Sequence, residues 1–235
     1  MTKRKDFLDI ISENRFIHIL LSILLGFVVG AIFLIGMGLS VGEAYGRLLS
    51  SITNLKGFSY VVVYAIPYIV VGLSVAFSFK TGVFNIGAEG QYVVGSMAAC
   101  CTSILCSGLP KPLLIPLCFL VAMAAGAIWG IIVGFLKTKW GINEVLSMIM
   151  FNWIAFYFSN FIAGIPAIHS DGTAEATKNI SPNASMLFSK AFIKKAGLCP
   201  TANWGILVAI VMTVLVWFVI EKTTLGFELK AVGSN

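Results

Sequence analysis

Long apolar segments separated by short polar breaks run along most of this chain. A transmembrane α-helix needs roughly 20 consecutive, mostly apolar residues, and windows of that kind recur here. We expect about six spans, with the approximate bounds Phe16–Leu39, Phe58–Phe79, Val83–Cys106, Pro112–Leu136, Ile142–Ile165 and Trp204–Ile220. Because every backbone polar group must be paired inside a membrane, the pattern predicts an all-α fold, a polytopic integral membrane helical bundle.

The composition agrees with a chain whose solvent is membrane lipid. Of the 235 residues, 58% are hydrophobic and 11% are charged, and the mean hydropathy of +0.95 lies far above that of an ordinary soluble domain. The net charge of +6 comes from lysines and arginines in short clusters beside apolar windows. This arrangement favours a role in membrane orientation and argues against nucleic acid as a partner.

The basic residues also predict how the chain crosses the membrane. Lysine and arginine concentrate on the cytoplasmic side of membrane proteins, and the chain starts with the basic segment Met1–Lys5. With a cytoplasmic N-terminus, the parity of the spans places Lys80, the Lys137–Lys139 turn and the final segment 221–235 inside as well. The first apolar run, Phe16–Met37, is too long for a signal-peptide core, so we interpret it as a retained helix.

Two polar segments fall on the opposite side of the membrane in this topology. They are Ser40–Gly57 and the longer stretch 166–203. The long stretch contains several lysines, but long translocated segments carry little weight in the charge rule. We therefore expect 166–203 to be an extracytoplasmic loop.

The sequence contains no pattern typical of a metal site, a disulfide framework or a catalytic nucleophile. The five cysteines have neither metal-ligand spacing nor a disulfide framework, and we interpret them as small buried hydrophobic residues. His18 and His169 have no carboxylate or second histidine at ligand spacing, and no serine lies in a nucleophile-elbow context. The sequence thus predicts no catalytic residue, no metal and no cofactor.

A polar, glycine-rich motif at 82–91 is the strongest functional signal. It places Asn85, Glu89 and Gln91 near the cytoplasmic end of the third span, where an uncompensated polar group is costly and usually lines a water-filled path or a protein interface. In a helix, Asn85 and Glu89 share a face and Gln91 points elsewhere. The glycines favour a broken or late-starting helix that faces the bundle interior. Alternatively, Glu89 bonds to neighbouring helices and only locks the fold.

A second polar cluster lies at the inner end of the fifth span. Asn143 and Glu144 start this cluster, and Ser147 and Asn152 lie further in. Asn143, Ser147 and, less well, Asn152 fall near one helical face, which could hydrogen-bond a polar solute. Polar bonding between helices explains any single one of these residues equally well.

The third stretch is the amphipathic segment Thr223–Asn235, which carries Phe227 and Leu229 among charged residues. A short helix of this kind lies at a membrane surface or docks into the groove of a partner protein.

Small residues and one proline give further expectations about the helices. Gly126, Gly130 and Gly134 recur every fourth residue, and Gly26 and Gly30 repeat the spacing in the first span. Such faces let neighbouring helices approach closely, so we interpret them as packing surfaces. Pro67 should kink or break the second span.

The three polar stretches, in this order and spacing, resemble the integral-membrane permease subunit of bacterial ABC importers, in the class that serves branched-chain amino acids, simple sugars and nucleosides. The resemblance is carried by Gly82-Val-Phe-Asn-Ile-Gly-Ala-Glu-Gly-Gln91, by Asn143-Glu144 with Met150-Phe-Asn152, and by Leu225-Gly-Phe with Ala231-Val-Gly-Ser-Asn235. The nucleoside-type branch is the most similar, because sugar-type members tend to carry Asp-Leu-Ser where this chain has Asn85-Ile-Gly87.

The resemblance implies a single transmembrane permease domain over 1–235, in a multi-pass protein of the bacterial cell membrane. It implies three kinds of partner: a second permease subunit, an extracytoplasmic solute-binding lipoprotein and cytoplasmic ATP-binding subunits. The segment 221–235 would couple to the ATPase, through Leu225, Gly226, Phe227, Ala231, Val232, Gly233 and Asn235. No phosphate-binding loop motif occurs in the chain, so ATP hydrolysis is expected from a separate subunit.

The leading functional expectation is a permease for nucleosides or related small polar solutes. Alternatives are a permease for simple sugars or riboflavin, an ion-coupled secondary transporter with broken helices and buried carboxylates, and a membrane scaffold that transports nothing. Members of the family continue beyond the Ala-Val-Gly segment into several more spans, whereas this sequence stops at Asn235. We therefore expect it to be the N-terminal part of a longer domain.

Overall fold

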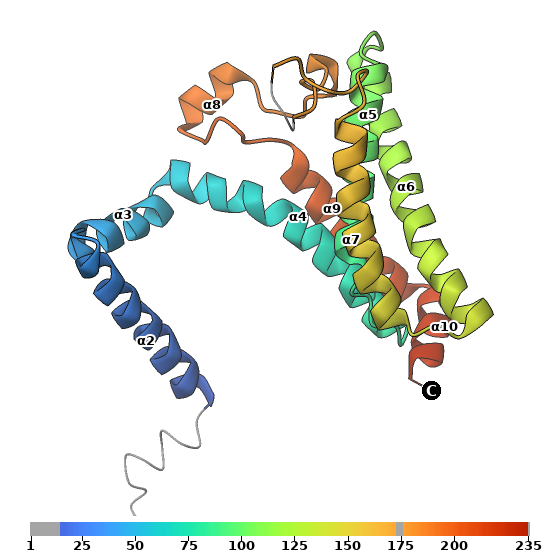
Figure 1. The fold of residues 1–235 in the computed structure, drawn as a ribbon, viewed down its shortest axis with the longest axis horizontal. Coiled ribbons are helices and arrows are strands. Elements are labelled where there is room, and N and C mark those ends of the chain that lie inside the picture. The colour runs from blue at the N-terminus through green and yellow to red at the C-terminus, as the bar shows by residue number, and fades with distance from the viewer. Residues whose placement is uncertain (1–14, 173–175, 235) are drawn as a thin grey trace, which may run out of the picture. The chain divides into compact units, whose positions relative to one another are not determined.

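The computed structural model describes residues 15–172 and 176–234, and helices form nearly all of its regular structure (Figure 1). The helices are α2 (Arg15–Gly36), α3 (Val41–Thr53), α4 (Leu55–Lys80), α5 (Ala88–Leu105), α6 (Lys111–Trp140), α7 (Glu144–Ala163), α8 (Lys190–Ala196), α9 (Gly205–Lys222) and α10 (Thr224–Gly233), with a 3-10 turn η1 at Pro182–Ala184. The described residues contain two isolated β-bridges and no strand. The predicted all-α fold class is confirmed.

Five of these helices are long and apolar enough to cross a membrane: α2, counted from Phe16, and α4, α6, α7 and α9. The predicted span Val83–Cys106 instead forms α5, which begins only at Ala88 and is not among the five. Its first turns carry Glu89 and Gln91, which lower its hydropathy. The structure therefore supports a multi-span bundle in which the third predicted span is a more polar helix that begins later than expected.

The described residues up to Phe58 form one compact unit, which contains α2 and α3. The Tyr45 hydroxyl donates a hydrogen bond of 2.5 Å to the Phe27 carbonyl, and the two rings meet edge to face. A Cβ atom at Gly30 would lie 2.9 Å from that hydroxyl, so the glycine gives α3 its close approach. Helix α3 was not predicted, because Ser40–Gly57 was described only as a polar segment between two spans. Ser40 caps α3 by accepting from the Glu43 amide.

Residues 59–235 form the second unit, in which α5 packs against both α6 and α7 (Figure 1). Small residues line these contacts. A Cβ atom at Gly95 would lie 3.1 Å from the Ala122 carbonyl oxygen, and one at Gly126 would lie 3.4 Å from the Gln91 carbonyl oxygen. The packing interpretation of the glycine row in α6 is thus confirmed for Gly126, whereas nothing lies within 4 Å of a Cβ at Gly134.

Within the long polar loop 166–203, the described residues 166–172 and 176–203 make hydrogen bonds to the helical bundle. The Ser181 amide donates to the Ser103 hydroxyl at 3.0 Å, and the Cys199 amide donates to the Ser59 hydroxyl at 2.7 Å. Cys199 is fully buried, as expected for a small hydrophobic residue. The loop therefore has fixed contacts with α5 and with the N-terminal end of α4.

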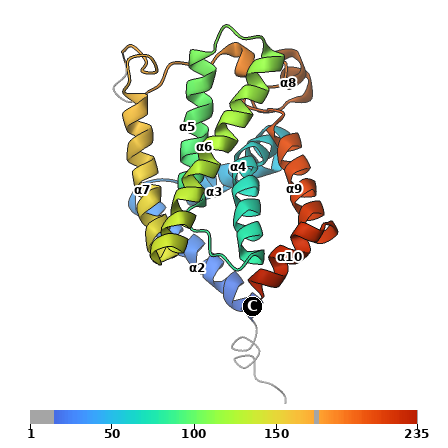
Figure 2. The same ribbon diagram turned by 90° about the vertical axis from the view of Figure 1, so that its right-hand side faces the viewer.

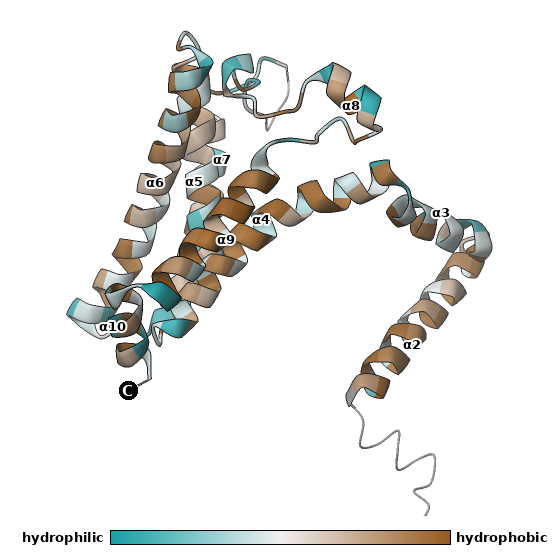
Figure 3. Cartoon of the chain, turned by 180° about the vertical axis from the view of Figure 1, so that it is seen from behind, coloured by the Kyte–Doolittle hydropathy of each residue, from teal (hydrophilic) through white to brown (hydrophobic). Residues whose placement is uncertain are grey.

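Helix α4 runs through Pro67 without a break. Of the two expected effects of this proline, the break is therefore wrong and the kink stays a prediction. Figure 3 shows apolar residues along α4 and α9 and hydrophilic residues in α8 and α10. The fold thus combines apolar spans with short, more polar helices.

Candidate functional site

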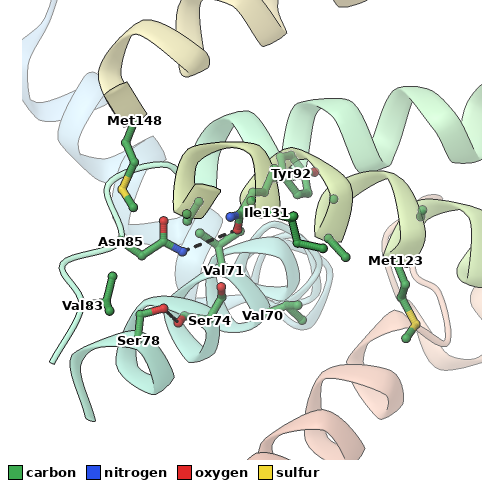
Figure 4. A pocket seen from close by; sticks show the side chains of 17 residues that line it. Val70, Val71, Ser74, Ser78, Val83, Asn85, Tyr92, Met123, Ile131 and Met148 are labelled. Atoms are coloured by element: carbon green, nitrogen blue, oxygen red, sulfur yellow. Dashed lines mark hydrogen bonds between the residues drawn. The ribbon is translucent and has the colours of Figure 1, made fainter. Parts of the chain in front are cut away.

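A wide-mouthed, largely open cavity of about 640 Å³ lies between α4, α5 and α6 and carries residues of the polar motif on its wall (Figure 4). Helix α4 contributes Ser74 and Ser78, the motif contributes Asn85 and Gln91, and Met148 of α7 closes one side. Valines of α4 and the small residues of α6 provide most of the remaining wall. The site is therefore a largely apolar space with a few polar groups.

Asn85 lies in the connection before α5, since that helix begins at Ala88. The late-starting helix that the glycines predicted is thus confirmed. Asn85 is only 8% exposed, and its Nδ2 donates a long hydrogen bond of 3.5 Å to Oε1 of Gln91. Its Oδ1 is buried and has no hydrogen-bond partner within the described part of the chain. A buried acceptor left unpaired costs about 1–3 kcal/mol, so this oxygen is an unusual feature of the site.

The expected geometry of the motif is wrong in one respect. Asn85 and Glu89 do not share a helical face, because Asn85 precedes the helix and is buried whereas Glu89 lies on the exposed side of its first turn. The residue that meets Asn85 is Gln91, which was expected to point elsewhere. A carboxylate in the first turn of a helix, such as that of Glu89, interacts favourably with the positive end of the helix dipole.

The lack of a side chain at Gly130 of α6 leaves space for the Gln91 side chain. A Cβ atom at Gly130 would lie 2.5 Å from Nε2 of Gln91, which is closer than real contacts allow. Both residues line the cavity. The glycine row of α6 therefore also makes room for a polar side chain beside the cavity, in addition to its role in packing.

Asn152 of α7 acts as a remote cap for α5. Its Oδ1 accepts a hydrogen bond of 2.9 Å from the Gly90 amide in the first turn of α5, and its Nδ2 donates at 3.1 Å to the Ile86 carbonyl. The residue at the N-cap position itself, Gly87, has no side chain to accept such a bond. Sequence reasoning missed this contact because the partners lie more than 60 residues apart.

The other members of the second cluster are bonded locally. Asn143 caps α7 by accepting from the amides of Val145 at 2.9 Å and Leu146 at 3.2 Å. Buried Ser147 donates to the Asn143 carbonyl at 3.0 Å. Glu144 forms an ion pair with Lys137 at the end of α6. These contacts agree with the helix-locking interpretation, and solute binding by this cluster stays a prediction.

The segment predicted to couple to an ATPase forms α10, which exposes apolar side chains. Thr223 caps the helix by accepting from the Gly226 amide at 3.2 Å. Gly226 is buried against the last carbonyls of α9, where a side chain would not fit. Leu225 is 53% exposed, and Phe227 and Val232 are each 72% exposed. Ala231 is also exposed, and Asn235 lies outside the described residues.

Gly233, at the end of α10, packs directly on the turn that leads into the polar motif. A Cβ atom at Gly233 would lie 2.5 Å from the Lys80 carbonyl oxygen and 2.7 Å from the Gly82 nitrogen. Gly82 adopts a left-handed conformation with φ +74°, which favours glycine. No sequence pattern indicated that these two glycines meet.

Comparison with known proteins identifies the class of this bundle. Residues 57–235 match the family described as branched-chain amino acid transport system / permease component. Since the match covers most of the chain, the protein belongs to this family of transport permeases. With several membrane-spanning helices, it is a multi-pass protein of the cell membrane.

Several individual members of this family are similar to the chain over most of its length. The chain is 39% identical over 218 residues to a guanosine ABC transporter permease protein of Bacillus subtilis. It is 35% identical over 225 residues to a nucleoside ABC transporter permease protein of Lactococcus lactis, and 32% identical over 219 residues to a glucose ABC transporter permease protein of Haloferax volcanii. Each alignment covers 92% of this chain but only 61%, 60% and 57% of the respective relative. No solved structure matches the chain significantly.

Proposed function

We propose that this chain is a permease subunit of an ATP-driven importer and that it translocates nucleosides or related small polar solutes. The observation that carries the proposal is the cavity of about 640 Å³ with the Asn85–Gln91 amide pair on its wall, inside a bundle of apolar helices. Polar side chains in such a bundle usually mark a substrate path. The relatives named for guanosine and for nucleosides support the same solute class.

The cavity suits a solute with a flat apolar face and a polar edge. Its volume lies within the range of about 300–1,000 Å³ that is typical of small-molecule sites. Val70, Val71 and Ile131 offer apolar surface to a base, while Asn85 and Gln91 offer amide groups to its hydrogen-bonding edge or to a sugar. This combination of an apolar wall and few polar groups is the usual composition of a ligand pocket.

Contacts at the two ends of α4 support the proposed placement in the membrane. Ser59, near the N-terminal end, holds the loop 166–203, and Lys80, at the C-terminal end, contacts α10. At 1.5 Å per residue the helix between them is about 30 Å long, which matches the thickness of a bilayer core. These contacts support our proposal that the loop 166–203 is extracytoplasmic and that the segment 221–235 is cytoplasmic.

Helix α10 is the proposed contact with the ATP-binding subunit. Its exposed Leu225, Phe227 and Val232 can enter an apolar groove in the manner of other helix-in-groove complexes. A second permease subunit and an extracytoplasmic solute-binding lipoprotein complete the proposed assembly, and lipid surrounds it. ATP hydrolysis belongs to the ATP-binding subunit.

The proposal is tested with the full-length permease, reconstituted in vesicles with its second permease, ATP-binding subunit and binding protein. Labelled guanosine should accumulate only with ATP, and a protonophore should leave that uptake unchanged. Asn85→Ala should lower uptake about tenfold, as expected if one hydrogen bond of about 1.4 kcal/mol is lost. Equal uptake with and without ATP would refute the mechanism, and collapse with the protonophore would indicate an ion-coupled carrier.

Simple sugars are the second candidate solute, because one relative is named for glucose. The same vesicles distinguish the two classes by competition. Excess unlabelled nucleoside should suppress guanosine uptake, whereas glucose and riboflavin should not. Suppression by glucose alone would favour the sugar alternative.

A further inference from the structure

We infer that the contact between Gly233 and Gly82 links α10 to the Asn85 segment, so that a displacement of α10 moves Asn85 at the cavity wall. This inference rests on the proposed function, and it adds a physical route from the ATPase side to the solute side. The route consists of α10, the turn Lys80–Gly82 and the connection Val83–Gly87.

The two glycines meet backbone to backbone. A Cβ atom at Gly82 would lie 3.0 Å from the Gly233 Cα, and one at Gly233 would lie 2.5 Å from the Lys80 carbonyl oxygen. Figures 1 and 2 both place α10 beside the C-terminal end of α4, where this contact occurs. Because no flexible side chain lies between the two backbones, motion of one pushes directly on the other.

The turn Lys80–Gly82, which contacts Gly233, is held by hydrogen bonds and by ring packing. The amides of Thr81 and Val83 both donate to the Ser78 carbonyl at 3.0 Å, and the rings of Phe79 and Phe84 lie 5.1 Å apart. A displacement at Gly82 therefore passes along the chain rather than being absorbed locally. Val83 and Asn85, the next lining residues, both face the cavity (Figure 4).

Two observations indicate that the middle of the Asn85 connection is the part that moves. Its far end is pinned, because Asn152 holds the Ile86 carbonyl and the Gly90 amide. Its middle is unsatisfied, because Asn85 Oδ1 has no partner among the described residues. A small shift that brings this oxygen to water or solute would gain a hydrogen bond, so a second arrangement of the segment is favoured once α10 moves.

The substitution Gly233→Ala tests the link. Alanine is the better helix former, so any loss cannot come from weakening α10 itself. The added methyl group must separate α10 from the turn. In the reconstituted complex we expect the ATP-binding subunit to remain bound and ATP hydrolysis to continue, while ATP-driven guanosine uptake falls by about two- to thirtyfold, the range seen when coupling networks are perturbed.

Gly72→Ala is the matched control, because Gly72 also lies inside a helix and nothing lies within 4 Å of a Cβ there. It should leave uptake as in the unmodified complex. Equal uptake in the Gly233→Ala and Gly72→Ala complexes overturns the link. Loss of the ATP-binding subunit from Gly233→Ala also overturns it, since Gly233 would then serve docking alone. If the unmodified complex imports no guanosine, the proposed function fails instead.

In a second experiment the inference predicts that uptake is kept rather than lost. This experiment does not use Gly233→Ala, so it does not depend on whether that variant folds. Thr81→Cys and Ser234→Cys flank the contact and can be joined by a short thiol-reactive crosslinker, with each single variant as a control. Since α10 and the turn should move as one body, the crosslinked complex should keep its ATP-driven uptake. Loss of uptake on crosslinking, with both single variants active, would mean that the contact must open during transport and would overturn the inference.

Discussion

Asn152→Ala is the substitution that best tests how the site is held together. The side chain satisfies two backbone groups at once, the Gly90 amide at 2.9 Å and the Ile86 carbonyl at 3.1 Å. Alanine removes both hydrogen bonds and offers no replacement. Because the Gly87 N-cap position has no side chain that can accept, the first turn of α5 would have no side-chain cap.

The expected destabilisation follows from these two contacts. Loss of a helix cap costs about 1 kcal/mol, and the unpaired Ile86 carbonyl adds about 1 kcal/mol in this partly buried position. The sum of about 2 kcal/mol corresponds to a fall in Tm of about 4–8 °C for a chain of this size.

Thermal unfolding in detergent, followed by a thiol-reactive or intrinsic fluorescence signal, measures the shift in Tm. Hydrogen exchange followed by mass spectrometry reports on the peptide that contains Ile86–Gly90, whose Gly90 amide should exchange faster. Asn160→Ala is the matched control, because Asn160 lies on the same helix and its side chain makes no hydrogen bond to other described residues.

If Asn152→Ala and Asn160→Ala lower Tm equally and leave exchange at Gly90 unchanged, the remote cap does not stabilise α5. Faster exchange at Gly90 with no change in Tm would instead show that the cap holds only the local segment and that the estimate of about 2 kcal/mol is too large.

Three further substitutions test other contacts. Gly90→Ala should destabilise the bundle by about 1–3 kcal/mol in thermal unfolding, because its Cβ would lie 2.8 Å from Asn152 Oδ1 and 3.2 Å from Trp129 Nε1; stability equal to that of Gly134→Ala would contradict this. Ser59→Ala should cost about 1–3 kcal/mol, because the buried Cys199 amide loses its acceptor, and unchanged hydrogen exchange in the loop would argue against it. Glu144→Gln should change stability by less than about 1 kcal/mol, because the Lys137 partner is 46% exposed; a larger loss would mean that the ion pair is buried in the full assembly.

Five of the predicted spans and the late start of α5 could be predicted from the sequence because they depend on local properties. Apolar stretches of helical length and a glycine-rich polar motif leave few alternatives once the solvent is lipid. Helix α3 was missed because its amphipathic sequence, Val41–Thr53, is too polar to span a membrane, and the search for apolar spans therefore passed over it.

The long-range contacts of the site could not be derived in the same way. The Asn152 cap joins residues more than 60 positions apart, and the Gly82–Gly233 contact joins residues about 150 positions apart. Helical periodicity shows which residues share a helical face, but it does not show which neighbouring helix or turn that face contacts. The pairing of Asn85 with Gln91 was missed because periodicity was applied to a residue that lies before the helix.

The polar residues of this bundle fall into two groups: those whose side chains hydrogen-bond to the protein itself, and those that have an unpaired buried group. A polar side chain inside a membrane protein is a functional candidate by default, because its burial is costly. In the second cluster, however, Asn143, Ser147 and Asn152 all bond to the protein's own backbone, which explains their presence without a solute. Asn85 differs, since its oxygen is buried beside a cavity without a partner in the described structure. A group that the fold leaves unsatisfied needs its partner from elsewhere, and in a permease the passing solute or its water can supply one.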